Sequence, residues 1–461
     1  MDLMGKIVEH ILSTQFEDLP QEVVSVTKKS VIDTLGAMIG GSAIEGCKLL
    51  VDFLRHCGGR PESTVAVFGD KLPAALAAQA NGAMARALEI DDVWDRRGLH
   101  PSASLVPTCL AICERHGNIS GKEFVAALAL GHDLNMRFSL AVNPVLTFTG
   151  RYTLFEVFAY TASAGKLLGL TEDQLWNAIG IAYSQMPGDL QAVADGVMTA
   201  YITQGTRGKA AIEAALMAER GITGTRNVLQ GQYGFFRAFE PNPDLSAFTN
   251  ELGKRFWGVD IARKFYSSCR FTHQPIELAQ NFWKEGVKPE DIDQITVKCG
   301  VQCYEATCKP VEEKRRPRTH VDVNFSTPFT VAIALVKGDV FISEVNDESI
   351  RDPVILEIAQ RVVPVIDPER ETELTVGSVV MELKMKDGQV LVKESKYPKG
   401  NPQNPVSMDD CIDKFRKAAS HSRIPFPSTQ LSEIVDIVND LENLENVNQL
   451  MGSVVPHGLG S

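Results

Sequence analysis

Residues 73–102 read PAALAAQANGAMARALEIDDVWDRRGLHPS. The alanine-rich first part favours a helix that packs closely against other helices. The stretch then changes to three carboxylates (Asp91, Asp92 and Asp95), two arginines and His100. Ionisable groups at the end of an apolar helix are costly to bury unless they are paired, so this loop is a candidate site. The spacing is equally compatible with a solvated loop that carries salt bridges.

Helical patterns dominate the chain on either side of this stretch. Apolar residues recur at helical spacing over 120–140, and an alanine-rich run at 210–220 ends at a glycine. Thr171 and Gln174 form a capping box, which marks the start of a helix. Because few strands are credible in this half, the sequence predicts a large all-helical domain whose first part covers 1–265.

The pattern changes after about residue 265. Short alternating segments and a turn dipeptide there predict a small sheet, and two apolar segments between them predict helices. The predicted elements are a strand at Ile292–Cys299, a hairpin at Met381–Val392 that turns at Asp387–Gly388, and helices at Pro328–Val336 and Pro353–Val363. The sequence therefore predicts an α+β domain over 266–398.

The chain returns to helical patterns after residue 398. Ser407–Asp410 resembles a helix start, and 431–450 is predicted to be an amphipathic helix. We expect the segment 399–461 to rejoin the first helical domain. The predicted fold class is mainly α, with a smaller α+β domain inserted into a large helical one.

Composition excludes several classes of function. A chain of 461 residues is too long for one core, and 44% hydrophobic with 23% charged residues is typical of globular proteins. The formal charge of −12 argues against binding to nucleic acids or anionic membranes. Without an apolar run of membrane-spanning length or a signal-peptide pattern, a cytoplasmic location is expected.

Nine cysteines are scattered through the chain without a Cys-x-x-Cys pair. Cys299, Cys303 and Cys308 have a spacing that fits no common zinc or iron–sulfur pattern. We therefore expect reduced thiols in a reducing compartment and no metal site.

Several segments, taken together and in order, resemble the MmgE/PrpD family, which includes 2-methylcitrate dehydratase, cis-aconitate decarboxylase and iminodisuccinate epimerase. The segments are Asp33–Gly36, Leu88–Asp92, His100–Ser102, Gly165–Leu170, Asp195–Thr199, Gly234–Phe236, Tyr266–Cys269 with His273, Asn324–Phe329 and Lys399–Pro405. The resemblance implies a helical domain interrupted by an α+β lid, an active site in the cleft between them, and a homodimer. It also implies cofactor-free removal of water or carbon dioxide from a small di- or tricarboxylate, or movement of a proton beside a carboxylate.

The resemblance assigns an acid–base pair to Asp92 and His100, with Asp91 orienting them. His100 could instead cap the helix that follows Pro101. His273 completes the catalytic candidates, one helical turn after Cys269.

Four further residues are candidates for substrate binding. Lys264 falls where family members carry a substrate-binding lysine, and Cys269 falls where some relatives have histidine. A lone cysteine is usually a small buried residue, so a nucleophilic role for Cys269 is disfavoured. Ser102 follows His100, and Lys399 is a candidate carboxylate clamp, although surface lysines are commoner than binding ones.

Three positions depart from the family pattern. Arg151 replaces a common histidine, Ala200 a lysine, and Phe329 a tyrosine. An arginine cannot act as a base at neutral pH, but it can bind a carboxylate in bidentate fashion, so Arg151 joins the binding candidates. Two proton-transfer groups are absent, which predicts an altered substrate or reaction.

A basic cluster and three functional hypotheses remain open at this point. Lys314, Arg315, Arg316, Arg318 and His320 could face the cleft, although a solvated loop is favoured. The leading hypothesis is a lyase that acts on a small polycarboxylate. The alternatives are an epimerase or isomerase of a dicarboxylate and a non-catalytic polycarboxylate-binding relative.

Overall fold

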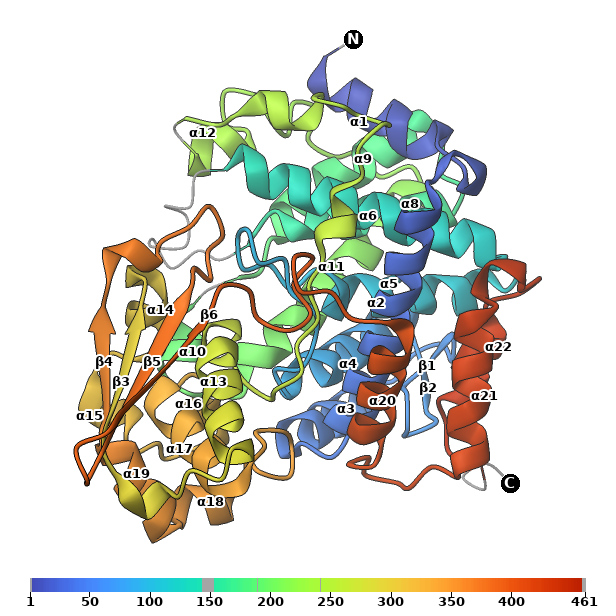
Figure 1. The fold of residues 1–461 in the computed structure, drawn as a ribbon. Helices are drawn as coiled ribbons and strands as arrows, with labels where there is room; N and C mark the ends of the chain where they lie inside the picture. The colour runs from blue at the N-terminus through green and yellow to red at the C-terminus, as the bar shows by residue number, and fades with distance from the viewer. Residues whose placement is uncertain (1, 143–152, 189, 241, 458–461) are drawn as a thin grey trace. The chain divides into compact units, whose positions relative to one another are not determined.

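The computed structural model describes residues 2–142, 153–188, 190–240 and 242–457 (Figure 1). Helices account for 58% of the chain and strands for 8%, which confirms the predicted mainly α class. The chain forms two compact units. The first comprises Met1–Ala87, His100–Val259 and Met408–Ser461, and the second comprises Leu88–Leu99 and Asp260–Ser407.

These units differ from the expected domains in one informative way. The second unit begins at Asp260 and ends at Ser407, several residues outside the predicted range 266–398, and it also includes Leu88–Leu99. Backbone hydrogen bonds explain the extra segment, because Val93 and Ala262 pair in both directions, at 3.0 and 2.7 Å.

Among its described residues, the first unit has helices and one two-stranded ribbon of β1 (Ser63–Thr64) and β2 (Lys71–Leu72). Its helices are α1 (Leu3–Ser13), α2 (Gln21–Gly41), α3 (Glu45–Cys57), α4 (Ala74–Ala87), α5 (Ser102–His116), α6 (Gly121–Ala141), α8 (Glu156–Leu167), α9 (Glu172–Ala182), α10 (Gln191–Ala194), α11 (Thr199–Glu219), α12 (Phe235–Phe239), α20 (Met408–Ala419), α21 (Ser428–Asn439) and α22 (Asn448–Ser453). The capping box predicted before α9 is confirmed.

Small residues allow α4 and α11 to approach closely. A Cβ atom added at Gly205 would lie 2.0 Å from the carbonyl oxygen of Gln79, and one at Gly82 would lie 2.8 Å from Cα of Gly205. Neither position has room for a side chain, so the backbones themselves form the contact. This packing explains why the sequence of α4 is so rich in alanine.

The second unit is built around a four-stranded sheet of order β4-β3-β5-β6. Its strands are β3 (Ile292–Cys299), β4 (Val362–Ile366), β5 (Val379–Met385) and β6 (Val390–Ser395), and its helices are α13 (His273–Lys284), α14 (Val301–Thr307), α15 (Val311–Lys314), α16 (His320–Asn324), α17 (Thr327–Lys337), α18 (Asp347–Arg351) and α19 (Pro353–Gln360). β3 pairs in parallel with β4 and antiparallel with β5, and β5 and β6 form the predicted hairpin. Apolar residues of α13, α17, α19 and the sheet share one core.

Two helix predictions are wrong in part. The helix predicted over 353–363 stops at Gln360, because Val362–Ile366 pairs with β3 as β4. The helix predicted over 431–450 is broken between α21 and α22. There the carbonyl of Leu444 accepts from Gly121 N at 2.9 Å, so tertiary contacts replace helical ones.

Candidate active site

The loop Leu88–Leu99 is buried inside the second unit. Asp91 and Asp92 are 0% exposed and Asp95 is 2% exposed. The segment folds back on itself, since Trp94 N donates to Leu99 O at 2.9 Å. The alternative of a solvated loop is therefore wrong, and the cost of burying these charges must be offset by partners.

Each buried carboxylate of this loop faces a cation from residues 263–270. Arg263 Nη1 lies 3.4 Å from Asp92 Oδ2. Lys264 Nζ donates to Glu89 Oε2 at 2.8 Å and lies 3.8 Å from Asp91 Oδ1. Ion pairs of this kind offset part of the cost of burying the acidic groups. Lys264 thus lies beside the predicted Asp91, whereas Arg263 was missed.

Arg270 and Asp95 form a bidentate pair. Nε and Nη2 of Arg270 donate to the two oxygens of Asp95 at 2.8 and 2.9 Å, and Asn401 Nδ2 donates to Asp95 Oδ2 at 2.7 Å. Nη1 of Arg270 donates to the carbonyls of Arg263 and Lys399, at 3.2 and 3.0 Å. One guanidinium therefore joins three segments of the second unit. Asp95 was named only as one of the carboxylates of the candidate loop, and Arg270, which directly follows a family motif, was not predicted.

His273 is buried with both ring nitrogens engaged by the protein. Its Nδ1 lies 3.2 Å from Arg270 Nη1, and its Nε2 lies 3.3 Å from Ser268 O. Because a guanidinium only donates, Nδ1 must accept and Nε2 carries the proton. This arrangement favours a structural role for His273 over the predicted catalytic one.

Lys399 and Glu277 are hydrogen-bonded to each other next to Arg270. Lys399 N donates to Glu277 Oε1 at 2.8 Å, and the Lys399 ammonium lies 4.3 Å from the centre of the Phe265 ring. Burial raises the pKa of Glu277 to about 7, partly opposed by the hydrogen bond from Lys399 and by the charge of Arg270. Nothing in the sequence around Glu277 indicated this.

The first unit holds His100 and Ser102 at the start of α5. Pro101 is the N-cap residue of that helix, so the alternative that His100 caps it is wrong. His100 Nε2 lies 3.4 Å from Arg86 Nη2, and its carbonyl accepts from Gln204 Nε2 at 3.4 Å. Ser102 Oγ lies 2.9 Å from His132 Nε2, and both groups are buried.

A buried polar chain continues from Gln204, one helical turn after Ala200. Gln204 Nε2 lies 3.4 Å from the Tyr160 hydroxyl, and Gln204 Oε1 accepts from Arg207 Nη1 at 2.8 Å. Arg207 also pairs with the buried Glu156. These residues were not predicted, because each lies on an alanine-rich or apolar helix that shows only packing signals.

The remaining predicted residues are distributed as follows. Arg151 lies outside the described residues. Cys269 is partly exposed, and its backbone N donates to Asn324 O at 2.7 Å. Phe329 is fully buried in the core of the second unit. Cys269 therefore remains a candidate for contact with substrate, whereas Phe329 is a packing residue.

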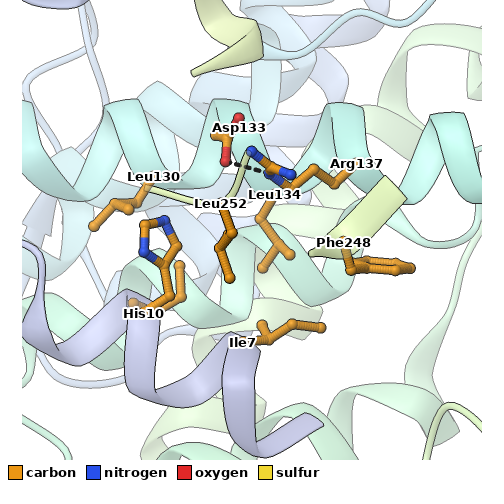
Figure 2. Close-up of a pocket in the computed structure, with 9 residues that line it drawn as sticks. Ile7, His10, Leu130, Asp133, Leu134, Arg137, Phe248 and Leu252 are labelled. Carbon is orange, nitrogen blue, oxygen red and sulfur yellow. Dashed lines mark hydrogen bonds and ion pairs between the residues drawn. The ribbon is translucent and has the colours of Figure 1, made fainter. Parts of the chain in front are cut away.

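A small pocket in the first unit contains ionisable groups that serve the fold. Figure 2 shows His10 of α1 facing Asp133 and Arg137 of α6. Arg137 pairs with Asp133 at 2.6 Å and donates to the carbonyls of Ala247, Asn250 and Arg255 at 2.8–2.9 Å. These contacts fasten the segment 247–255 to α6.

In the part of the chain that the structure describes, no helix is long and apolar enough to cross a membrane.

Comparison with known proteins gives matches over most of the chain. The family model for the MmgE/PrpD N-terminal domain matches residues 5–247, and that for the MmgE/PrpD C-terminal domain matches 266–440. Cis-aconitate decarboxylase of Aspergillus terreus is 24% identical, over 94% of this chain and 92% of the relative. The human cis-aconitate decarboxylase is 24% identical over 94% and 90%. The 2-methylcitrate dehydratase of Salmonella typhimurium is 21% identical over 96% and 94%.

Proposed function

We propose a lyase activity for this protein, on the premise that the chain belongs to the MmgE/PrpD family. The proposed reaction removes water or carbon dioxide from a small tricarboxylate. Similarity over most of the chain to decarboxylases and dehydratases supports it. The observation that carries the proposal is the burial of Asp91 and Asp92, which belong to a family motif. Both are fully buried, and they lie beside the cations Lys264 and Arg263.

The proposed chemistry is acid–base catalysis by Asp92 and His100. In a dehydration, Asp92 takes a proton from the carbon beside a carboxylate, the electron pair forms the alkene, and His100 protonates the departing hydroxyl. In a decarboxylation, the carbon–carbon bond breaks, carbon dioxide leaves, and the acid protonates the remaining carbanion.

The substrate carboxylates need cationic and hydroxyl partners. We assign this role to Lys264, Arg151 and Lys399, with Ser102 as a hydroxyl donor and Cys269 beside the substrate. Asp91 positions Lys264, whose ammonium lies 3.8 Å from it. His273 is left out of the proton transfers because both of its ring nitrogens are engaged.

An assay with cis-aconitate, 2-methylcitrate and citrate tests the proposal. Alkene absorbance and released carbon dioxide would be followed for the wild type, Asp92→Asn and His100→Ala, with Asp413→Asn on the exposed face of α20 as a matched control. We expect turnover of at least one acid, lost in both site variants and kept in the control. No turnover of any acid refutes the lyase proposal. Full activity of either site variant refutes its assigned role.

A second candidate is an epimerase or isomerase that moves a proton without elimination. Ala200 favours it, because it stands where the family commonly has a lysine that could protonate a departing group. Deuterium incorporation from solvent without alkene formation would distinguish it from the lyase. A non-catalytic polycarboxylate-binding protein would gain thermal stability with the ligand and never turn it over.

We also propose a homodimer in the cytoplasm. Leu49 and Phe53 on α3 are 53% and 60% exposed, and Met198 lies beside the same helix at Gly46. Such an apolar patch supports self-association. All nine cysteines are free, which supports a reducing compartment. Light scattering on a Leu49→Glu/Phe53→Glu variant tests the dimer, which we expect to become monomeric.

A further inference from the structure

Lys314, at the end of α15, differs from the other buried cations of the second unit. Arg263, Lys264 and Arg270 each contact a carboxylate. The Lys314 side chain is half-buried, and within the described ranges its ammonium makes no hydrogen bond or ion pair. Burial lowers the pKa of Lys314, as expected for an ammonium whose lost hydration is not replaced.

Two hydrogen bonds connect the backbone of Lys314 with that of Cys269 through residues 324–326. Ser326 Oγ donates to Lys314 O at 2.5 Å, and Cys269 N donates to Asn324 O at 2.7 Å. Both bonds end on the short segment 324–326, so the backbones of Lys314 and Cys269 are attached to the same three residues. The charges of the Cys269 and Cys308 side chains partly oppose the lowering of the Lys314 pKa.

The nearby carboxylates are committed elsewhere. Asp322 accepts from the backbone N of Arg318 and of Thr319, both at 3.0 Å. Glu313 is exposed to solvent. Neither comes within ion-pair distance of Lys314 among the described residues. An anion that entered beside Cys269 would therefore meet an ammonium with unused hydrogen-bonding capacity.

We propose that Lys314 is a substrate-binding residue that holds one carboxylate of the tricarboxylate beside Cys269. The inference rests on the proposed function, because it needs a polycarboxylate ligand. It gives Lys314 a role that distinguishes tricarboxylates from dicarboxylates, since a dicarboxylate can bind while leaving this ammonium without a partner. A charged hydrogen bond of this kind corresponds to about a 10- to 100-fold change in affinity.

Binding of a non-reacting ligand tests this role separately from turnover. Tricarballylate has three carboxylates but no hydroxyl or alkene, and glutarate has the same chain with two carboxylates. Calorimetry would compare both ligands on the wild type, Lys314→Met and Lys314→Arg. Lys309→Met is the matched control, because Lys309 is exposed and paired with Glu305 at 3.0 Å. The melting temperature of each variant reports on folding.

We expect Lys314→Met to bind tricarballylate about 10- to 100-fold more weakly, to lose the preference over glutarate, and to melt no lower than the wild type. Lys314→Arg should keep the preference, and Lys309→Met should behave as the wild type. An unchanged preference in Lys314→Met overturns the inference, as does a wild type that binds neither ligand. If the wild type binds tricarballylate but turns over no acid, the lyase proposal fails while the role of Lys314 stands.

Discussion

Replacing Glu277 by glutamine should stabilise the protein increasingly as the pH rises. The pKa of Glu277 is raised from 4.5 to about 7, mainly by burial. The folded state therefore holds a proton that the unfolded state has lost, so stability falls as the pH rises between these values. The difference corresponds to about 3 kcal/mol above pH 8 and less than about 1 kcal/mol at pH 5. Glutamine does not titrate, and its carbonyl can still accept from Lys399 N.

Urea unfolding at pH 5, 6, 7 and 8, followed by circular dichroism, measures this difference. Glu290→Gln is the matched control, because Glu290 is exposed in the same unit. A constant offset caused by the new side chain would not depend on pH, so the change with pH is diagnostic. The reasoning is refuted if the difference between Glu277→Gln and the wild type is the same at every pH, or if it shrinks as the pH rises.

Three further changes test other parts of the structure. Burial and the charge of Arg137 lower the pKa of His10 to about 4, so the protein should lose up to about 3 kcal/mol as the pH falls from 6.5 to 4, and His10→Gln should lose less, as measured by urea unfolding across that range. Arg270→Met should cost about 3–5 kcal/mol in the same assay because Asp95 remains buried without its bidentate partner, and a loss below about 1 kcal/mol would contradict this. Gly205→Val should lower the melting temperature by several degrees or prevent folding, because its Cβ would lie 2.0 Å from a backbone oxygen, and an unchanged melting temperature would show that α4 and α11 can separate.

Local signals predicted most elements correctly. The capping box at Thr171 and the hairpin turn at Asp387–Gly388 each depend on residues within a few positions of one another. The errors occur where hydrogen bonds to distant segments decide the local structure. Val362–Ile366 forms a strand because β3 offers an edge to pair with, and 431–450 is interrupted because Leu444 bonds to Gly121.

The candidate site was likewise predictable from the sequence only in part. An apolar helix followed by Asp91, Asp92 and His100 indicated a site, because ionisable groups are costly to bury unless they are paired. The sequence did not reveal the partners of these residues. Arg270 Nη1 lies beside the ring of His273, which favours a structural role for that histidine, and Arg263 lies beside Asp92 in the buried loop.

By itself, the sequence determined the helical class, the inserted α+β segment and the loop that carries the candidate site. Tertiary structure alone decided which cation meets which carboxylate, since Asp92 and Arg263 are 171 positions apart and Asp95 and Arg270 are 175 positions apart. Ion pairing requires atoms within about 4 Å of each other, and burial strengthens it. Composition and spacing carry no information on contacts at that separation. Only the tertiary structure therefore distinguishes the paired cations Arg263 and Arg270 from Lys314, whose ammonium makes no ion pair among the described residues.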